Sequence, residues 1–416
     1  MSDVRNYAVV TASYWGFTIT DGALRMLVLL HFHTLGYKPL DLAILFLLYE
    51  AMGIITNLFG GWLGVRFGLR LTLFAGLFIQ VVALLMLSAM PTDITISLSV
   101  VYVMTSQALS GVAKDLTKMS SKSAVKVVVA EDDQGTLFKW VSILTGSKNA
   151  LKGAGFFIGG LLLQEFGFQG ALNLMAGGLF VVLLACTQLL KDDLGKSEKN
   201  VTFKEMFSKT REINYLSAAR IFLFASRDVW FVVGVPVFLA STAGWNYNQV
   251  GASMASWIIG YGIVQAYVPN LLRHRSSLSH VTFSAKLWCF ILLFIPVLIA
   301  LGLSNIVSDW LSGQEIEYNP ALWLMIGLAI FGVVFAVNST VHSYLIVAYS
   351  DADKPSLSIG FYYMANALGR LIGTFLSGFI FQYWGLLACL IISSIMVLIA
   401  LVLTFPLGNV RDEKAD

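Results

Sequence analysis

The chain contains 416 residues, of which 57% are apolar and only 12% are charged. Soluble domains carry about 25% charged residues, so this composition excludes an ordinary soluble protein and predicts an all-α integral membrane protein. The formal net charge of +3 gives no indication of nucleic-acid binding. The sequence contains no hydrolytic triad, zinc motif or phosphate-binding loop. We therefore expect that the protein is neither an enzyme nor an ATP-driven pump. We also expect no catalytic residue and no bound metal or cofactor.

Long apolar runs predict twelve transmembrane helices. They cover residues 8–33, 41–64, 71–90, 98–125, 137–162, 168–190, 214–240, 248–270, 281–303, 321–347, 357–381 and 385–408. The first run is too long for a removable signal peptide and lacks a small-residue cleavage site. Basic residues are concentrated on alternate connections between the spans, and cytoplasmic connections of membrane proteins are enriched in lysine and arginine. This pattern predicts that both termini are cytoplasmic, and it leaves only Lys38 on the outer side.

The only long polar run, 191–212, separates six predicted spans from the other six. It predicts a six-helix bundle at 1–190, a cytoplasmic linker at 191–212, and a second bundle with a short cytoplasmic tail at 213–416. Short matches also recur in a common order. Leu35-Gly36-Tyr37 parallels Ala243-Gly244-Trp245, Asn149-Ala-Leu parallels Asn366-Ala-Leu, and the endings Gly160 to Gly167 and Gly378 to Gly385 agree. Separations of 208 to 218 residues indicate a duplicated unit.

A glycine-rich segment with Gly61, Arg66, Gly68 and Arg70 closes the second span. It resembles the cytoplasmic loop of the major facilitator superfamily, and we expect these residues to form a gating loop. Val65 stands where the superfamily pattern has an acid, which leaves the charge latch of that loop without its carboxylate. The resemblance implies two six-helix bundles around a central cavity whose access alternates.

Apart from Lys139, Lys286 and Asp41, which we assign to the ends of their spans, the predicted spans contain nine lysines and arginines and only four carboxylates. The basic residues are Arg25, Lys114, Lys118, Lys122, Lys148, Lys152, Arg220, Arg227 and Arg370; the acids are Asp21, Glu50, Asp115 and Asp228. A charge at bilayer depth costs at least about 2.5–3.5 kcal/mol and normally faces an interior pathway. The excess of positive charge predicts a substrate with several negative charges.

Two lysine runs are central to this prediction. In the fourth span Lys114, Lys118 and Lys122 follow at intervals of four, which places them on one helical face. Lys122 fits better a lysine that extends to the cytoplasmic interface, and we do not count it among the substrate-binding candidates. In the fifth span Lys148 and Lys152 share a face near mid-span. Lysine suits phosphate as a compact point charge.

Other interior charges can pair with one another or serve the substrate. Asp21 and Arg25 are four residues apart and can form a pair within one helix, with a structural or a functional role left open. Arg227 and the adjacent Asp228 point in different directions, so we expect their partners on other helices, with Arg220 on the face of Arg227. The substrate-binding candidates are Arg25, Lys114, Lys118, Lys148, Lys152, Arg220, Arg227, His342 and Arg370.

Transport without a nucleotide motif needs an ion gradient, an exchange or the gradient of the substrate itself. Glu50 has no basic residue three or four positions away, so it is a candidate for proton exchange or a hydrogen-bonded neutral acid. His342, four residues after Asn338, is a candidate for anion binding, proton relay or simple core packing. We expect proton antiport, with Asp21, Glu50, Asp115 and Asp228 as the coupling candidates.

Four segments resemble the ArsJ-type organoarsenical efflux permeases: Tyr14 to His33, the lysine run after Ser110, Leu144 to Gly160, and Ser217 to Phe238. The resemblance implies export of 1-arseno-3-phosphoglycerate across a bacterial inner membrane, with resistance to arsenate as the result. It also implies a functional partner, a glyceraldehyde-3-phosphate dehydrogenase that makes this compound from arsenate. The substrate carries a phosphate at one end and an arsenate at the other, which agrees with an interior rich in cations.

Two other functions fit part of the pattern. An organophosphate:phosphate antiporter would need much the same cations. A membrane enzyme or scramblase acting on anionic lipids would need a nucleophile, a metal set or a polar groove facing lipid, and the sequence shows no nucleophile or metal motif.

Overall fold

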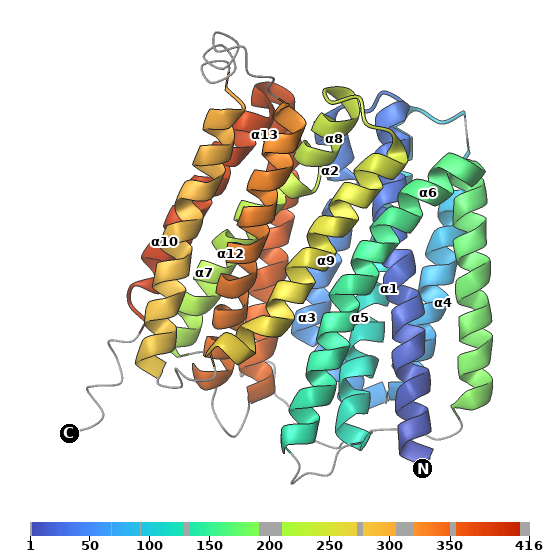
Figure 1. Ribbon diagram of the computed structural model, residues 1–416. Coiled ribbons are helices and arrows are strands. Elements are labelled where there is room, and N and C mark those ends of the chain that lie inside the picture. The colour runs from blue at the N-terminus through green and yellow to red at the C-terminus, as the bar shows by residue number, and fades with distance from the viewer. Residues whose placement is uncertain are drawn as a thin grey trace. The chain divides into compact units, whose positions relative to one another are not determined.

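The computed structural model describes residues 2–67, 69–91, 93–128, 134–190, 210–272, 278–304, 319–349 and 355–407. Within these ranges the chain is helical, with short turns and no strand (Figure 1). The chain forms two compact units, and each draws on more than one part of the sequence.

Unit 1 comprises Met1–Gly36, Ile44–Glu205 and Tyr247–Ile259. Its helices are α1 (Ser2–Thr34), α3 (Leu47–Phe67), α4 (Leu69–Ser88), α5 (Ile96–Val128), α6 (Gln134–Leu189) and the first half of α9 (Tyr247–Leu272). Inside this unit α5 packs against α3 and α4, while α1 packs against α6. A core of apolar side chains, including Phe17, Leu77 and Leu183, holds these helices together.

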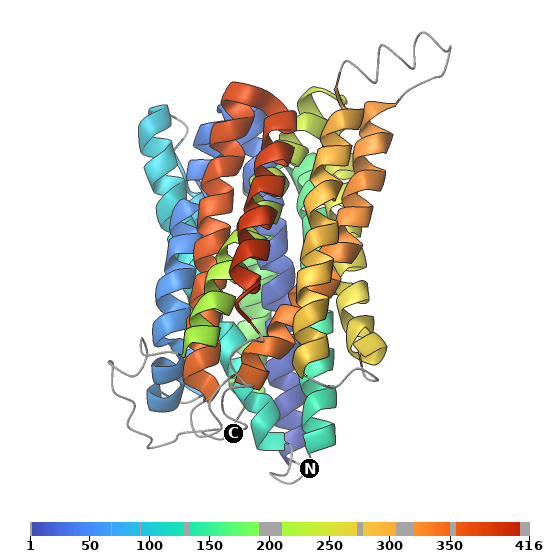
Figure 2. The same ribbon diagram turned by 90° about the vertical axis from the view of Figure 1, so that its left-hand side faces the viewer.

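Unit 2 comprises Tyr37–Ala43, Met206–Asn246 and Gly260–Asp416. Its helices are α2 (Pro39–Ile44), α7 (Arg211–Phe231), α8 (Gly234–Ser241), the rest of α9, α10 (Leu278–Gly302), α12 (Pro320–Tyr349) and α13 (Pro355–Thr404). Here α7 packs against α13, and α10 packs against α12 and α13, as Figure 2 shows for the orange and red helices. The predicted linker at 191–212 lies almost wholly outside the described residues, so the predicted domain boundaries stay a prediction.

Eight of the described helical stretches are long and apolar enough to cross a membrane. The first predicted span and the eighth, which correspond to α1 and α9, are not among them, so the number of twelve spans stays a prediction. The chain is nevertheless a helical, multi-pass membrane protein.

Glycines mark where the helices turn, and they support the predicted internal repeat. Four described glycines have positive φ: Gly36, Gly167, Gly244 and Gly385, at 84°, 66°, 70° and 76°. Two of these, Gly167 and Gly385, divide α6 and α13 into two helical arms each, at the predicted boundaries between spans. Glycine adopts this conformation without the steric cost that a side chain would add. All four occur at positions that the sequence repeat pairs with one another.

The predicted gating loop is more helical than expected. Helix α3 continues to Phe67, beyond the predicted end of the second span at residue 64. It therefore includes both Gly61 and Arg66. The side chain of Arg66 and the whole of Gly68 lie outside the described residues. The guanidinium of Arg70 lies 5.4 Å from the centre of the Phe74 ring. A gating role for these residues stays a prediction.

Close helix contacts at glycine bring together the helices that carry charge. A Cβ atom at Gly22 of α1 would lie 2.6 Å from the carbonyl oxygen of Lys152 in α6, and one at Gly155 would lie 2.5 Å from that of Ile19. In unit 2 a Cβ at Gly373 of α13 would lie 2.7 Å from the Cβ of Asp228 in α7. Only glycine fits at these crossings, and small residues are what allow membrane helices to approach closely.

We expect Gly155→Ala to lower the stability of the protein, because the added methyl group meets backbone that cannot move away. Overpacking of this kind costs about 1–3 kcal/mol. Gly177→Ala is the matched control on the same helix, since a Cβ there has no atom within 4 Å. Thermal unfolding of both variants in detergent checks this, and equal melting temperatures would contradict the assigned crossing.

Candidate functional site

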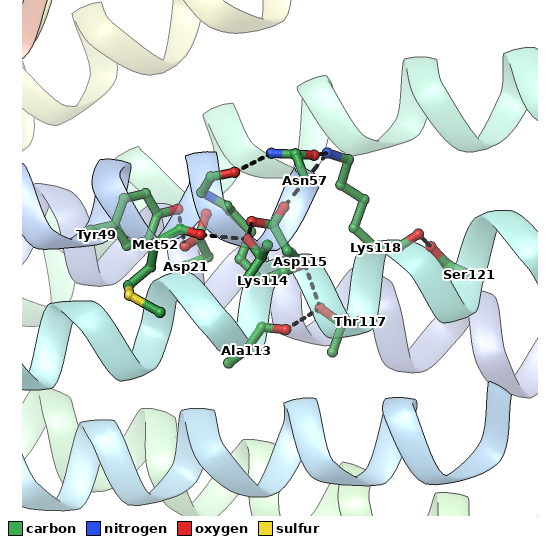
Figure 3. A network of polar contacts seen from close by, with 12 residues as sticks. Asp21, Tyr49, Met52, Asn57, Ala113, Lys114, Asp115, Thr117, Lys118 and Ser121 are labelled. Atoms are coloured by element: carbon green, nitrogen blue, oxygen red, sulfur yellow. Dashed lines mark hydrogen bonds and ion pairs between the residues drawn. The ribbon is translucent and has the colours of Figure 1, made fainter. Parts of the chain in front are cut away.

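Unit 1 carries a group of charged and polar side chains on α1, α3, α5 and α6, which we call the N-terminal cluster. Its members are Asp21, Arg25, Tyr49, Glu50, Asn57, Lys114, Asp115, Lys118, Lys148 and Lys152. Figure 3 shows six of them, with Lys114, Asp115 and Lys118 of α5 facing Tyr49 and Asn57 of α3 and Asp21. The structure therefore brings together residues from four of the predicted spans.

Arg25 pairs with Glu50 rather than with Asp21. The Arg25 Nη2 atom lies 2.8 Å from Glu50 Oε1, and the two side chains are 12% and 1% exposed. The sequence had suggested a pair within α1 between Asp21 and Arg25, and that pair is not formed. Helical spacing shows which residues share a face, but not which partners a neighbouring helix supplies. A role of Glu50 in proton exchange stays a prediction.

Asp21 is held by α3 and α6 instead. The hydroxyl of Tyr49 donates a hydrogen bond of 2.6 Å to Asp21 Oδ1. The ammonium of Lys152 lies 4.0 Å from Asp21 Oδ2. This ion pair follows from the close crossing of α1 and α6, because Gly22 next to Asp21 touches the backbone of Lys152 itself.

Asp115 and Lys118 form the second acid–base group of this cluster. Lys118 Nζ lies 3.6 Å from Asp115 Oδ1 and donates a 2.9 Å hydrogen bond to Asn57 Oδ1. The hydroxyl of Thr56 donates to the other carboxylate oxygen, Oδ2. Asp115 thus has a cationic partner one turn along its own helix, and α3 supplies two neutral partners, Thr56 and Asn57, that the sequence had not indicated.

Lys114 differs from its neighbours. Its ammonium lies over the ring of Tyr49, 4.0 Å from the ring centre. Among the described residues it has no carboxylate within ion-pair distance. Lys148 is half-buried on α6. The side chain of Lys122 lies outside the described residues, so its role stays a prediction.

Unit 2 carries a second group, the C-terminal cluster: Arg220, Arg227 and Asp228 on α7, Asn338, Ser339 and His342 on α12, and Asn366 and Arg370 on α13. Arg227 pairs with the adjacent Asp228 at 2.6 Å. Arg370 Nε lies 3.7 Å from Asp228 Oδ2. The expectation that Arg227 and Asp228 point apart was therefore wrong, because the long arginine side chain folds back to its neighbour. Of these two residues, only Asp228 has an oppositely charged partner on another helix, Arg370 of α13.

Arg220 binds neutral groups of the protein. It is 5% exposed and donates to Asn366 Oδ1 at 3.1 Å and to the carbonyl of Ser339 at 3.0 Å. Its guanidinium also lies 4.0 Å from the centre of the Phe224 ring. These contacts join α7 to α12 and α13, so Arg220 has a structural task whether or not it also meets a substrate.

His342 and Asn338 are fully buried on α12. The two side chains are not hydrogen-bonded to each other. A role of His342 in anion binding or proton relay stays a prediction.

The charge imbalance remains when the pairs are counted. The described parts of the two clusters hold eight cations and four carboxylates, a formal excess of four positive charges. Each of the four carboxylates lies within 4.0 Å of a cation. Sequence reasoning missed Tyr49 and Asn57, since nothing in their spacing distinguishes them from other polar residues of a span, and it marked Asn366 only as part of the internal repeat. Such an arrangement can bind an anion without a metal or cofactor.

We expect Glu50→Ala to destabilise the protein more than the double variant Arg25→Met with Glu50→Leu. Removing one partner of a buried ion pair leaves the other charge without compensation, which costs about 3–5 kcal/mol. Replacing both partners by apolar residues removes that penalty. Thermal unfolding and membrane abundance check the order, and an E50A variant as stable as the double variant would contradict a buried pair.

Comparison with known proteins agrees with this architecture. The family model described as Major Facilitator Superfamily matches residues 8–312, which is more than half of the chain. The search of curated proteins returned no match to the chain. The helical fold, the membrane-spanning stretches and this match lead to one conclusion: the chain belongs to the major facilitator superfamily of membrane transporters.

Proposed function

We propose that this transporter exports an organic polyanion. The observation that carries the proposal is the excess of cations over carboxylates in the two clusters, whose helices, α1 apart, include stretches long and apolar enough to cross a membrane. A charge there is costly unless it serves a pathway or a partner. Because every carboxylate of the clusters is already near a cation, the remaining positive charge favours a negatively charged substrate.

We propose 1-arseno-3-phosphoglycerate as that substrate, with resistance to arsenate as the result. The support is the resemblance of four segments to organoarsenical efflux permeases, together with the two oxyanion groups of this compound. Export would remove an unstable acyl-arsenate made by a glyceraldehyde-3-phosphate dehydrogenase, the proposed functional partner, in the bacterial cytoplasm. The charge of the clusters alone supports only the wider class of phosphorylated organic acids.

The same clusters also fit an organophosphate:phosphate antiporter. Lysines such as Lys114 and Lys152 would then bind phosphate esters on one side and inorganic phosphate on the other. The two candidates differ in direction and in the need for phosphate on the far side of the membrane.

Transport into everted membrane vesicles tests the function directly. Arsenate, glyceraldehyde 3-phosphate, NAD and the dehydrogenase are supplied outside, and arsenic inside the vesicles is measured. We expect accumulation only when all four components and the transporter are present. Accumulation that depends on phosphate inside the vesicles would favour the antiporter. If no arsenic accumulates either with or without phosphate inside, both functions would be rejected.

We propose that export is coupled to proton entry, through one of Asp21, Glu50, Asp115 and Asp228. Outward movement of a polyanion is also favoured by a membrane potential that is negative inside, by about 2.3 kcal/mol per charge per 100 mV. In the same vesicles an ionophore that collapses only the pH gradient separates these driving forces. We expect slower uptake; unchanged uptake without a counter-substrate would show that proton coupling is wrong.

We expect Lys114→Gln, Lys148→Gln and Lys152→Gln each to reduce transport and arsenate resistance at equal membrane abundance. Losing a charge-assisted contact costs about 1.5–3 kcal/mol, roughly ten- to more than hundred-fold in affinity. Lys286→Gln is the control, because Lys286 of α10 belongs to neither cluster, and its ammonium lies 5.7 Å from the Phe405 ring centre. Wild-type resistance in all three cluster variants would remove these lysines from the site.

A further inference from the structure

Tyr49 lies at the centre of the N-terminal cluster. Its side chain is 4% exposed, its hydroxyl donates to Asp21 at 2.6 Å, and its ring faces the ammonium of Lys114 at 4.0 Å. The guanidinium of Arg25 also lies 5.6 Å from the ring centre. One aromatic residue on α3 thus touches charges of both α1 and α5, as Figure 3 shows for Asp21 and Lys114.

The backbone fixes where this ring lies. A Cβ at Gly111 of α5 would lie 2.7 Å from the carbonyl oxygen of Tyr49, so α3 and α5 touch at this residue. Lys114 follows Gly111 by three residues, about one helical turn, and therefore lies on the face of α5 that meets α3. The hydrogen bond to Asp21 fixes the other end of the Tyr49 side chain. The ring therefore has little freedom to leave Lys114.

Lys114 combines the contact with Tyr49 with the absence of a carboxylate at ion-pair distance among the described residues, which distinguishes it from three other cations of this cluster. Arg25, Lys118 and Lys152 each lie near a carboxylate, which cancels much of their charge. The face of an aromatic ring attracts a cation through its quadrupole but carries no net charge. Lys114 is thereby stabilised in place and still available to an anion.

We propose that Tyr49 is the positioning residue for substrate binding: its ring holds Lys114 charged and unneutralised, ready for an oxyanion of the substrate. This inference rests on the proposed function and extends it to a residue that itself needs no contact with the substrate. The hydroxyl of Tyr49 serves to fix the ring through Asp21, so the ring matters more than the hydroxyl. Replacing the ring by an aliphatic side chain would leave Lys114 free to turn away from the pathway or toward Asp21.

The test measures the binding of 3-phosphoglycerate, a stable phosphorylated acid, to the purified full-length protein by titration calorimetry. We expect Tyr49→Phe to bind within about three-fold of the wild type, and Tyr49→Met to bind about ten-fold more weakly, since cation–π contacts contribute about 0.5–2 kcal/mol. Tyr49→Leu repeats the loss of the ring with a different shape, in case the methionine variant does not fold.

Two controls separate positioning from a general effect on the fold. Phe46→Leu removes a neighbouring ring that faces Arg25 at 5.2 Å, a cation already paired with Glu50, so its affinity should stay within about two-fold. In the Lys114→Gln background, Tyr49→Met should cost less than about two-fold, because the two changes remove the same interaction.

Each outcome has a distinct meaning. A wild-type protein that does not bind 3-phosphoglycerate rejects the proposed function and the inference with it. Binding by the wild type with equal affinities for the phenylalanine, methionine and leucine variants rejects the inference alone. The inference is also overturned if Tyr49→Met weakens binding as much in the Lys114→Gln background as in the wild type, since Tyr49 would then act through the fold and not through Lys114.

Discussion

The charged interior depends on how closely two pairs of helices approach, α1 with α6 and α7 with α13. An ion within a bilayer must find a partner at short range, because no water is present to replace one. Glycines at the crossings let the helices approach closely enough for such contacts: Gly22 touches the backbone of Lys152, and Gly373 touches Asp228 itself. A bulkier residue at either position would separate acid from base and leave both charges exposed to a medium of low dielectric constant.

The two units solve this problem in the same way. In unit 1 the first helix supplies Asp21 and the first arm of α6 supplies Lys152, at 4.0 Å. In unit 2 α7 supplies Asp228 and the first arm of α13 supplies Arg370, at 3.7 Å. Lys152 and Arg370 are 218 residues apart, the same separation as Gly160 and Gly378 in the sequence repeat. The ion pairs therefore belong to the duplicated unit, although acid and base sit among otherwise different neighbours.

Sequence reasoning predicted the elements better than the contacts. Glycines that end a span, such as Gly167 and Gly385, are recognisable because their left-handed conformation excludes most other residues. The choice of partner is different, since it depends on the distance and rotation of a neighbouring helix. Arg25 lies on the same face of α1 as Asp21, yet Glu50 of α3 is nearer to its guanidinium. Tyr49 gave no signal at all, because a tyrosine in a span is usually a packing residue.

The distinction between paired and ring-bound cations suggests how the proposed anion pathway could stay positive. Carboxylates stabilise interior lysines and arginines at the expense of their charge, and a site built only of such pairs would have no preference for an anion. Aromatic rings stabilise a cation and leave its charge intact. Both units contain such a contact: Lys114 over Tyr49, and Arg220 over Phe224 with only neutral hydrogen-bond acceptors. The ion pairs would then fix the helices, while the ring-bound cations preserve the positive field that selects a polyanion.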